Sequence, residues 1–254
     1  MLRGPAASSA ASRIAFALCL ICFSAGAAAR SVDERFDRAL HRHVQDGVVD
    51  YPAIAGDADF RAYVASLAEP VSFGSRSDEL AHYINAYNAL VIQGILEGLS
   101  PATLIGRIRL FKLKDWRFDG RSIDLYALEH ELLIPLGEAR IHFSIVCASK
   151  SCPKLRSEAY TTERLPLQLE ENARAFINDP GRNRFDRGRK VAHLSAIFKW
   201  YERDFSGAAG SLQKYLARYV DDSSVARDLS DDRYAIEWND YDWGLNGTPP
   251  STRR

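Results

Sequence analysis

Several signatures of well-known enzyme classes are missing from this sequence of 254 residues. Neither glycine-rich pattern that cradles phosphates, GxGxxG or GxxxxGK[ST], occurs, so nucleotide cofactors are not expected. The GxSxG elbow that would support a serine triad is absent. So is the zinc-binding pattern HExxH. We therefore predict that the chain uses no cofactor.

Long apolar runs are also scarce. The longest, residues 14–23, spans ten residues (IAFALCLICF), whereas a transmembrane helix needs about 20. Arg3 and Arg13 precede the core of this run, and the small residues 24–29 (SAGAAA) follow it. This order is typical of a secretory leader, so we predict a cleaved signal peptide over residues 1–29 and an exported, periplasmic or extracellular protein. The alternative is a retained membrane anchor.

The chain has no excess of either charge, with 33 basic and 33 acidic residues. Loss of the leader would leave a net charge of −2, which argues against nucleic acid or anionic lipid as a dedicated partner. The local basic cluster Arg107, Arg109, Lys112 and Lys114 is interpreted as a solvated strand edge. No second apolar segment approaches membrane length, so no membrane span is expected after cleavage.

Cysteine is rare after the leader, where Cys147 and Cys152 alone remain. In an oxidising compartment the pair is interpreted first as a disulfide, for which four intervening residues leave enough room. A free catalytic thiol and two inert reduced cysteines are the alternatives. A zinc site with His130 and His142 is disfavoured because the mature chain has no CxxC pair, and we predict no metal.

The remaining pattern predicts a single globular domain over residues 31–246, followed by a disordered tail over residues 247–254 that is rich in Pro, Ser and Arg. Few strands are scattered among many helices, which favours an α+β fold, mostly helical, with a small and largely antiparallel sheet. Helices are predicted over residues 32–45, 78–97, 124–133, 163–177, 195–201 and 210–219. Strands are predicted for a hairpin turning at Asp119-Gly120, a segment over residues 140–147, a hairpin containing Gly188 and a last strand over residues 234–238.

Polar residues on the strongest helix need partners. His82, Asn85 and Asn88 are spaced three apart, so they share one face. Asparagine competes for backbone groups and is a poor helix former. Asn85 and Asn88 are therefore expected either to satisfy buried backbone groups or, with His82, to bind a polar part of a substrate.

Glu129 and His130 are adjacent on the helix after the hairpin. Adjacent helical side chains point about 100° apart, so the two are not expected to pair. His130 is a candidate general base because its ordinary pKa lies near neutrality. A buried histidine bonded to the backbone is the alternative.

Cys147 ends the predicted strand and opens the loop that carries Lys150 and Ser151. A nucleophilic cysteine needs a base within reach and a lowered pKa, to which Lys150 would contribute. Ser151 is a candidate substrate-binding residue. On a regular strand His142 would face away from Cys147, which makes His130 or His82 the better base.

Aromatic residues are dense near the C-terminus, beside acidic residues, at Trp200, Tyr201, Trp238, Tyr241 and Trp243. Such a cluster lines either a ligand groove or the closing layer of the core.

Five short motifs occur in order along the chain: residues 83–90 (YINAYNAL), 128–130 (LEH), 142–153 (HFSIVCASKSCP), 198–205 (FKWYERDF) and 241–246 (YDWGLN). In this combination the chain resembles the domain of unknown function 547 family, over roughly Phe36 to Asn246. The resemblance implies a shared fold and no particular activity.

Two functional hypotheses remain. In the first, the domain binds a small polar ligand or a protein partner in a polar pocket, without turnover. In the second, it is a hydrolase or acyl transferase in which His130 acts with Asn85 or Asn88 and, if reduced, Cys147, with Glu129 nearby.

Overall fold

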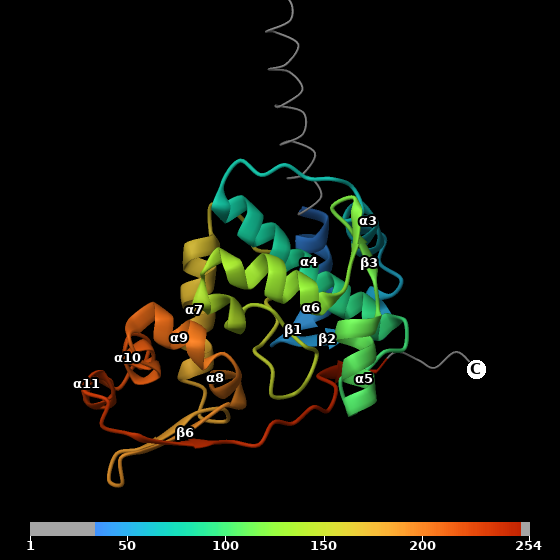
Figure 1. Ribbon diagram of the computed structural model, residues 1–254. Coiled ribbons are helices and arrows are strands. Elements are labelled where there is room, and N and C mark those ends of the chain that lie inside the picture. Colours follow the sequence, from blue (N-terminus) through green and yellow to red (C-terminus); the bar gives the residue numbers. More distant parts are fainter. Residues whose placement is uncertain (1–33, 250–254) are drawn as a thin grey trace, which may run out of the picture.

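The computed structural model describes residues 34–249 (Figure 1). The predicted leader and residues 250–254 of the predicted tail lie outside this range. Within it, no helix combines the length and the apolar character needed to cross a membrane.

The helix α4 (Arg76–Leu96) is the central element of the larger core. Ser75 caps it by accepting a hydrogen bond from the Asp78 backbone N–H, and Asp78 and Glu79 complement the positive end of its dipole. From Leu80 onward α4 is almost entirely buried, between α3 (Ala58–Ser66), α6 (Leu125–Ala127) and the π-helix η2 (Leu128–Leu133). The long helix predicted from its apolar face is confirmed, with both ends near the predicted positions.

Other helices surround this core and extend the molecule to one side (Figure 1). Residues 34–43 form the first described helix. The others are α2 (Tyr51–Ile54), α5 (Leu104–Ile108), η1 (Arg109–Leu113), η3 (Ile134–Leu136), η4 (Ala139–Phe143), α7 (Leu165–Ile177), α8 (Ala196–Trp200), α9 (Glu202–Ala209), α10 (Leu212–Ala217) and α11 (Ser223–Ser230).

The strands of the described chain form three small sheets, which confirms a mostly helical α+β fold. Strand β1 (Val44–Gln45) pairs antiparallel with β2 (Val48–Asp50), and β2 pairs parallel with β8 (Gly247–Thr248). The second sheet is the hairpin of β3 (Trp116–Phe118) and β4 (Arg121–Ile123). The third joins β5 (Arg184–Asp186) antiparallel to β6 (Val191–Leu194), and β6 parallel to β7 (Ala235–Trp238).

The predicted turn at Asp119-Gly120 is present. Both residues have positive φ, 51° and 72°, as the mirror-image turn of a two-residue hairpin requires. The Asp119 and Gly120 N–H groups donate to the Leu67 and Ala68 carbonyls, so the turn is docked on the chain after α3.

The strand predicted over residues 140–147 is wrong. Residues Ala139–Phe143 form the 3-10 helix η4, which Glu138 caps. Asn172 from α7 donates to the Phe143 carbonyl, and Asn88 from α4 pairs with Ser144 and Val146. These side chains satisfy the backbone groups that a strand would have offered to a neighbour.

The buried apolar residues form two clusters. One is built around α4 and spans the N-terminal half, and the other is built from α7 to β7. After β7 the chain runs along the bottom of the molecule in Figure 1 and returns to the first cluster, where β8 pairs with β2. Gly247 and Thr248, predicted to begin the disordered tail, are therefore paired.

Candidate functional site

A cavity of about 250 Å³ lies where the two apolar clusters meet. Its walls are mostly aromatic and aliphatic, and its polar groups are a carboxylate, two thiols, two imidazoles and several hydroxyls. It is lined by Tyr87, Phe111, Tyr126, Glu129, His130, His142, Ile145, Val146, Cys147, Cys152, Pro153, Ile197, Trp200, Tyr201, Tyr241 and Trp243.

A second cavity, of about 270 Å³, is lined around Phe143, Lys154, Asp179 and Arg182. It contains no cysteine or histidine, the residue types that carry nucleophilic and acid–base chemistry near neutral pH. The first cavity is therefore the candidate site.

The Cys147 thiol is surrounded by hydrogen-bonding groups. Its Sγ lies 2.9 Å from the Ser149 hydroxyl and 3.2 Å from the Tyr241 hydroxyl. Burial alone would raise the pKa of Cys147. Hydrogen bonds from the Cys152 thiol, Ser149 and Tyr241 outweigh burial and lower it to about 7. Lys150, predicted to supply this effect, lies instead 4.0 Å from Asp242 and is exposed.

Cys152 has the opposite character. Burial raises its pKa well above the ordinary value of a thiol, so it remains protonated beside the Cys147 thiolate. Its Sγ accepts a hydrogen bond from the Cys147 backbone N–H at 2.9 Å. Both cysteines are free, so the predicted disulfide is not formed in this structure.

Ala148, next to the nucleophile candidate, has a φ of 59°. This left-handed conformation is costly for a residue with a Cβ and persists only where the surroundings fix it. The Ala148 carbonyl accepts from Asn246 N–H, and Lys150 N–H donates to the Gly244 carbonyl, each at 2.8 Å. The C-terminal segment therefore holds the sharp turn after Cys147.

On the other wall, two tyrosines converge on Glu129. Tyr87 from α4 donates to Glu129 Oε2 at 3.0 Å, and Tyr201 donates to Oε1 at 2.5 Å. Burial first, and then the Glu129 carboxylate, raise the pKa of both tyrosines well above the ordinary value. Both phenols therefore stay protonated and satisfy the buried carboxylate.

His142 is the better-oriented of the two histidines. Its Nε2 lies 2.8 Å from Asp204 Oδ2, and its ring stacks on Tyr201 at 3.7 Å. The hydrogen bond from His142 lowers the pKa of Asp204. A carboxylate only accepts, so Nε2 carries the hydrogen and Nδ1 is the basic nitrogen of the neutral ring. That nitrogen is buried and has no hydrogen-bond partner.

The prediction that His142 faces away from Cys147 assumed a regular strand. This segment is not a strand, so the prediction does not apply. Both residues line the same cavity, as does His130. The His130 ring stacks on Tyr126 at 3.9 Å, and its Nδ1 lies 3.1 Å from the Tyr126 carbonyl.

The two asparagines of α4 do not line the cavity. Asn85 pairs with both backbone groups of Tyr160, and Asn88 bridges the Ser144 carbonyl and the Val146 N–H, all at 2.8–2.9 Å. Each amide thus anchors a loop, the first of the two roles expected for them. Asn88 in particular fixes the chain that leads to Cys147.

His82 and Ser151 also lie away from the cavity lining. His82 packs against Phe118 of the hairpin, and burial lowers its pKa to about 4. Ser151 accepts from the Asp242 N–H at 2.9 Å and so helps to hold the C-terminal segment.

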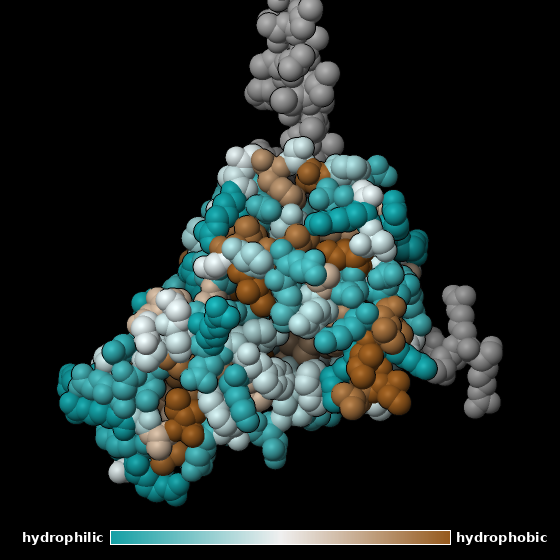
Figure 2. Space-filling model, in the orientation of Figure 1, coloured by the Kyte–Doolittle hydropathy of each residue, from teal (hydrophilic) through white to brown (hydrophobic). Residues whose placement is uncertain are grey.

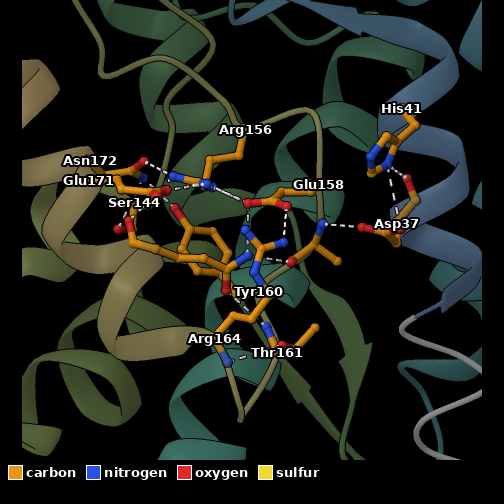
Figure 3. A network of polar contacts seen from close by, with 12 residues as sticks. Asp37, His41, Ser144, Arg156, Glu158, Tyr160, Thr161, Arg164, Glu171 and Asn172 are labelled. Atoms are coloured by element: carbon orange, nitrogen blue, oxygen red, sulfur yellow. Dashed lines mark hydrogen bonds and ion pairs between the residues drawn. The ribbon is translucent and has the colours of Figure 1, made fainter.

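A polar network supports the loop behind the cysteines (Figure 3). Arg156 is ion-paired with Glu158 and with Glu171 of α7, and its Nη1 donates to Asn172 Oδ1 at 2.9 Å. Asn172 in turn bonds Tyr160 and the Phe143 carbonyl. The network connects α7, η4 and the loop after Pro153 into one support.

The C-terminal aromatics form the rim of the cavity. Trp200, Tyr241 and Trp243 contact one another, with ring centroids 4.5–5.5 Å apart, and all three line the cavity. Trp238 packs against the second apolar cluster instead.

Glu129, His130 and Cys147, all predicted from the sequence as site residues, line one cavity. Asp204 and the hydroxyl of Tyr241 are partners that the sequence did not predict. Both lie in the motifs that carry the family resemblance, and this was the signal in the sequence that could have identified them. Among residues 34–249 no group of three or more His, Cys, Asp or Glu side chains is arranged to hold a metal ion.

Of three comparisons with known proteins, only the one with family models gave a match. Neither a curated protein nor a solved structure matches the chain. Residues 71–177 match the family described as "Protein of unknown function, DUF547", and this segment contains α4, Glu129, both cavity histidines and both cysteines. The predicted resemblance to the DUF547 family is confirmed over residues 71–177.

Proposed function

We propose that the domain is a cysteine-dependent hydrolase or acyl transferase with Cys147 as its nucleophile. The observation that carries the proposal is the Cys147 thiol, whose pKa is lowered to about 7 on the wall of a cavity that also holds two histidines. The thiolate is the reactive form of cysteine, so a pKa near neutrality supplies the nucleophile under ordinary conditions.

In the proposed reaction the basic Nδ1 of His142 takes the proton of the Cys147 thiol, and the resulting thiolate attacks an acyl carbonyl carbon. The new C–S bond forms as the bond to the leaving group breaks, and the leaving group takes a proton from the protonated His142 ring. Water or another acceptor then attacks the thioester, loses its proton to His142 and releases the acyl product with the thiolate restored. Asp204 orients His142, the arrangement that nucleophile–base pairs generally require.

The walls indicate the substrate class. Aromatic and aliphatic side chains dominate the cavity, and its one carboxylate is already bonded by two tyrosines. An acyl group with an apolar or aromatic body fits this lining better than a charged one.

We further propose that the chain works outside the cytoplasm, on the support of the leader-like residues 1–29. An oxidising compartment would favour a Cys147–Cys152 disulfide, which would consume the nucleophile. Activity is therefore expected to require a reductant or a dedicated reducing partner.

Ligand binding without turnover is the second candidate. The enzyme hypothesis assigned Asn85 and Asn88 to orient the catalytic base. Both side-chain amides are instead engaged with backbone groups, which favours binding without turnover.

One experiment separates the two functions. The purified protein, reduced, is incubated with p-nitrophenyl esters of increasing acyl length, and release of nitrophenol is followed together with the protein mass. We expect turnover and an acyl adduct on Cys147, both abolished in Cys147→Ser. Loss of activity in His142→Gln and Asp204→Asn would identify the base and its positioning residue, whereas loss in His130→Gln alone would assign the base to His130.

His193→Gln is the matched control, because His193 pairs with Glu237 and does not line the cavity. If the wild-type protein binds the esters but neither turns them over nor acquires an acyl group, the enzyme proposal fails and ligand binding remains.

A further inference from the structure

The segment over residues 104–113 exposes apolar side chains instead of burying them. It consists of α5 and η1, which follow one another without a break. Leu104, Ile105, Ile108 and Leu113 are 64%, 65%, 41% and 69% exposed. Apolar side chains gather accordingly over α5 in Figure 2.

This exposure is unusual for the molecule. Eight large hydrophobic residues are exposed among residues 34–249. Four belong to this segment, and two more, Tyr126 and Trp200, line the cavity. A contiguous apolar surface of this kind marks an interaction site, whereas scattered single residues do not.

The same segment is strongly basic. Arg107, Arg109, Lys112 and Lys114 lie within or directly after it, and no acidic residue occurs between Leu104 and Lys114. A helical segment with exposed Leu and Ile beside Arg and Lys has the composition of elements that lie in the plane of an anionic membrane surface.

The basic segment is joined to the cavity rim. Arg107 lies over the Trp243 ring at 4.3 Å, and Lys112 lies over the Tyr126 ring at 4.1 Å. Phe111 lines the cavity itself. Tyrosine and tryptophan are the residues that settle at the boundary of lipid headgroups and acyl chains.

The net charge of the whole chain argues against anionic lipid as a partner, but the local charge of this segment is opposite in sign to that of such a surface. From this arrangement we propose that residues 104–113 dock the protein on an anionic lipid surface, with the cavity mouth beside the contact. The four exposed leucines and isoleucines enter the headgroup region, and the exposed Arg109 and Lys112 meet the lipid phosphates. The placement gives the cavity direct access to acyl groups held at the bilayer surface. It does not depend on the chemistry proposed for Cys147.

A second copy of the chain is a poorer occupant. Symmetric self-association would place the same patch against itself. Arg107, Arg109 and Lys112 would then face their own copies, and like charges across an interface oppose binding.

Co-sedimentation with lipid vesicles tests the proposal. Vesicles of phosphatidylcholine alone are compared with vesicles of phosphatidylcholine and an equal part of phosphatidylglycerol. We expect the wild-type protein to bind the anionic vesicles more strongly, and added salt to weaken that binding. Arg109→Gln and Lys112→Gln should each reduce partitioning about fivefold, and the double substitution Leu104→Ser, Ile105→Ser should reduce it further.

Leu167→Ser and Arg187→Gln are the matched controls, since Leu167 is 53% exposed on α7 and Arg187 is exposed near the β5–β6 turn. Both should bind like the wild type. Cys147→Ser should also bind normally, which separates docking from catalysis.

The proposal is overturned if the wild type does not prefer anionic vesicles, or if the segment variants and the controls lose binding equally. It is also overturned if sedimentation equilibrium shows a dimer that the Leu104→Ser, Ile105→Ser variant abolishes.

Discussion

Cys147 and Cys152 show how environment divides two identical side chains into different roles. Cys147 lies beside the hydroxyls of Ser149 and Tyr241, and its pKa is lowered to about 7. Cys152 is buried without comparable support for a negative charge, and its pKa is raised. The pair therefore combines one thiol whose pKa is lowered with one whose pKa is raised.

The alkylation rate of Cys147 tests this division. Because the thiolate is the nucleophile, the rate with iodoacetamide should rise with pH through a midpoint near pH 7 and then level off. Tyr241→Phe and Ser149→Ala each remove a donor, so the midpoint should move toward the ordinary thiol value of about 8.5. Mass spectrometry should find Cys152 unlabelled at these pH values. A wild-type midpoint that already equals that of Tyr241→Phe would contradict the assignment.

The sequence predicts which residue types can belong to the site, but it does not predict which side chains bond to one another. Glu129, His130 and Cys147 were foreseen because few side chains can serve as acid, base or nucleophile. Their partners were not, since Tyr201 meets Glu129 across 72 positions and Tyr241 meets Cys147 across 94. Contacts of that separation depend on the packing of whole elements, which periodicity does not encode.

At the scale of elements, local chemistry decided most outcomes. The Asp124 side chain caps α6 by accepting from the Ala127 N–H, as its position before the helix suggested. The strand predicted over residues 140–147 does not form, because β-branched residues favour a strand only in the absence of stronger tertiary partners. Asn88 and Asn172 supply those partners from two separate helices.

The β3–β4 turn gives an element-scale prediction. Gly120 has a φ of 72°, and a Cβ there would lie 3.2 Å from Pro70 Cγ. Gly120→Ala should therefore lower the free energy of unfolding by about 1–2 kcal/mol, the cost of the left-handed conformation for a residue with a Cβ. Urea denaturation measures the change.

Gly207 provides the contrasting control. It lies inside α9, and a Cβ there would meet nothing within 4 Å. Gly207→Ala should stabilise the protein by up to about 1 kcal/mol through higher helix propensity. Equal effects of the two substitutions would show that backbone conformation at the turn is not what Gly120 supplies.

At the scale of the whole molecule, the C-terminal segment connects the two apolar clusters. It leaves the second apolar cluster after β7, contributes Tyr241 and Trp243 to the cavity and ends as β8 on the first sheet. The sequence favoured disorder beyond Gly247 because Pro, Ser and Arg dominate there. Pairing with β2 outweighs that local preference for Gly247 and Thr248, and only the assembled fold presents β2 as a partner.

Truncation after Asp240 tests this role. It removes Tyr241, β8 and three backbone hydrogen bonds, in which the Asp242 and Gly244 carbonyls accept and the Asn246 N–H donates, all with residues 148–151. At about 1 kcal/mol for each of three such bonds, the melting temperature should fall by about 6–12 °C. The alkylation midpoint of Cys147 should also rise, because Tyr241 no longer stabilises the thiolate. Deleting residues 250–254 alone is the control and should change neither quantity. If both truncations behave alike, the segment is not what closes the cavity, and the thiolate must be stabilised by Ser149 and Cys152 alone.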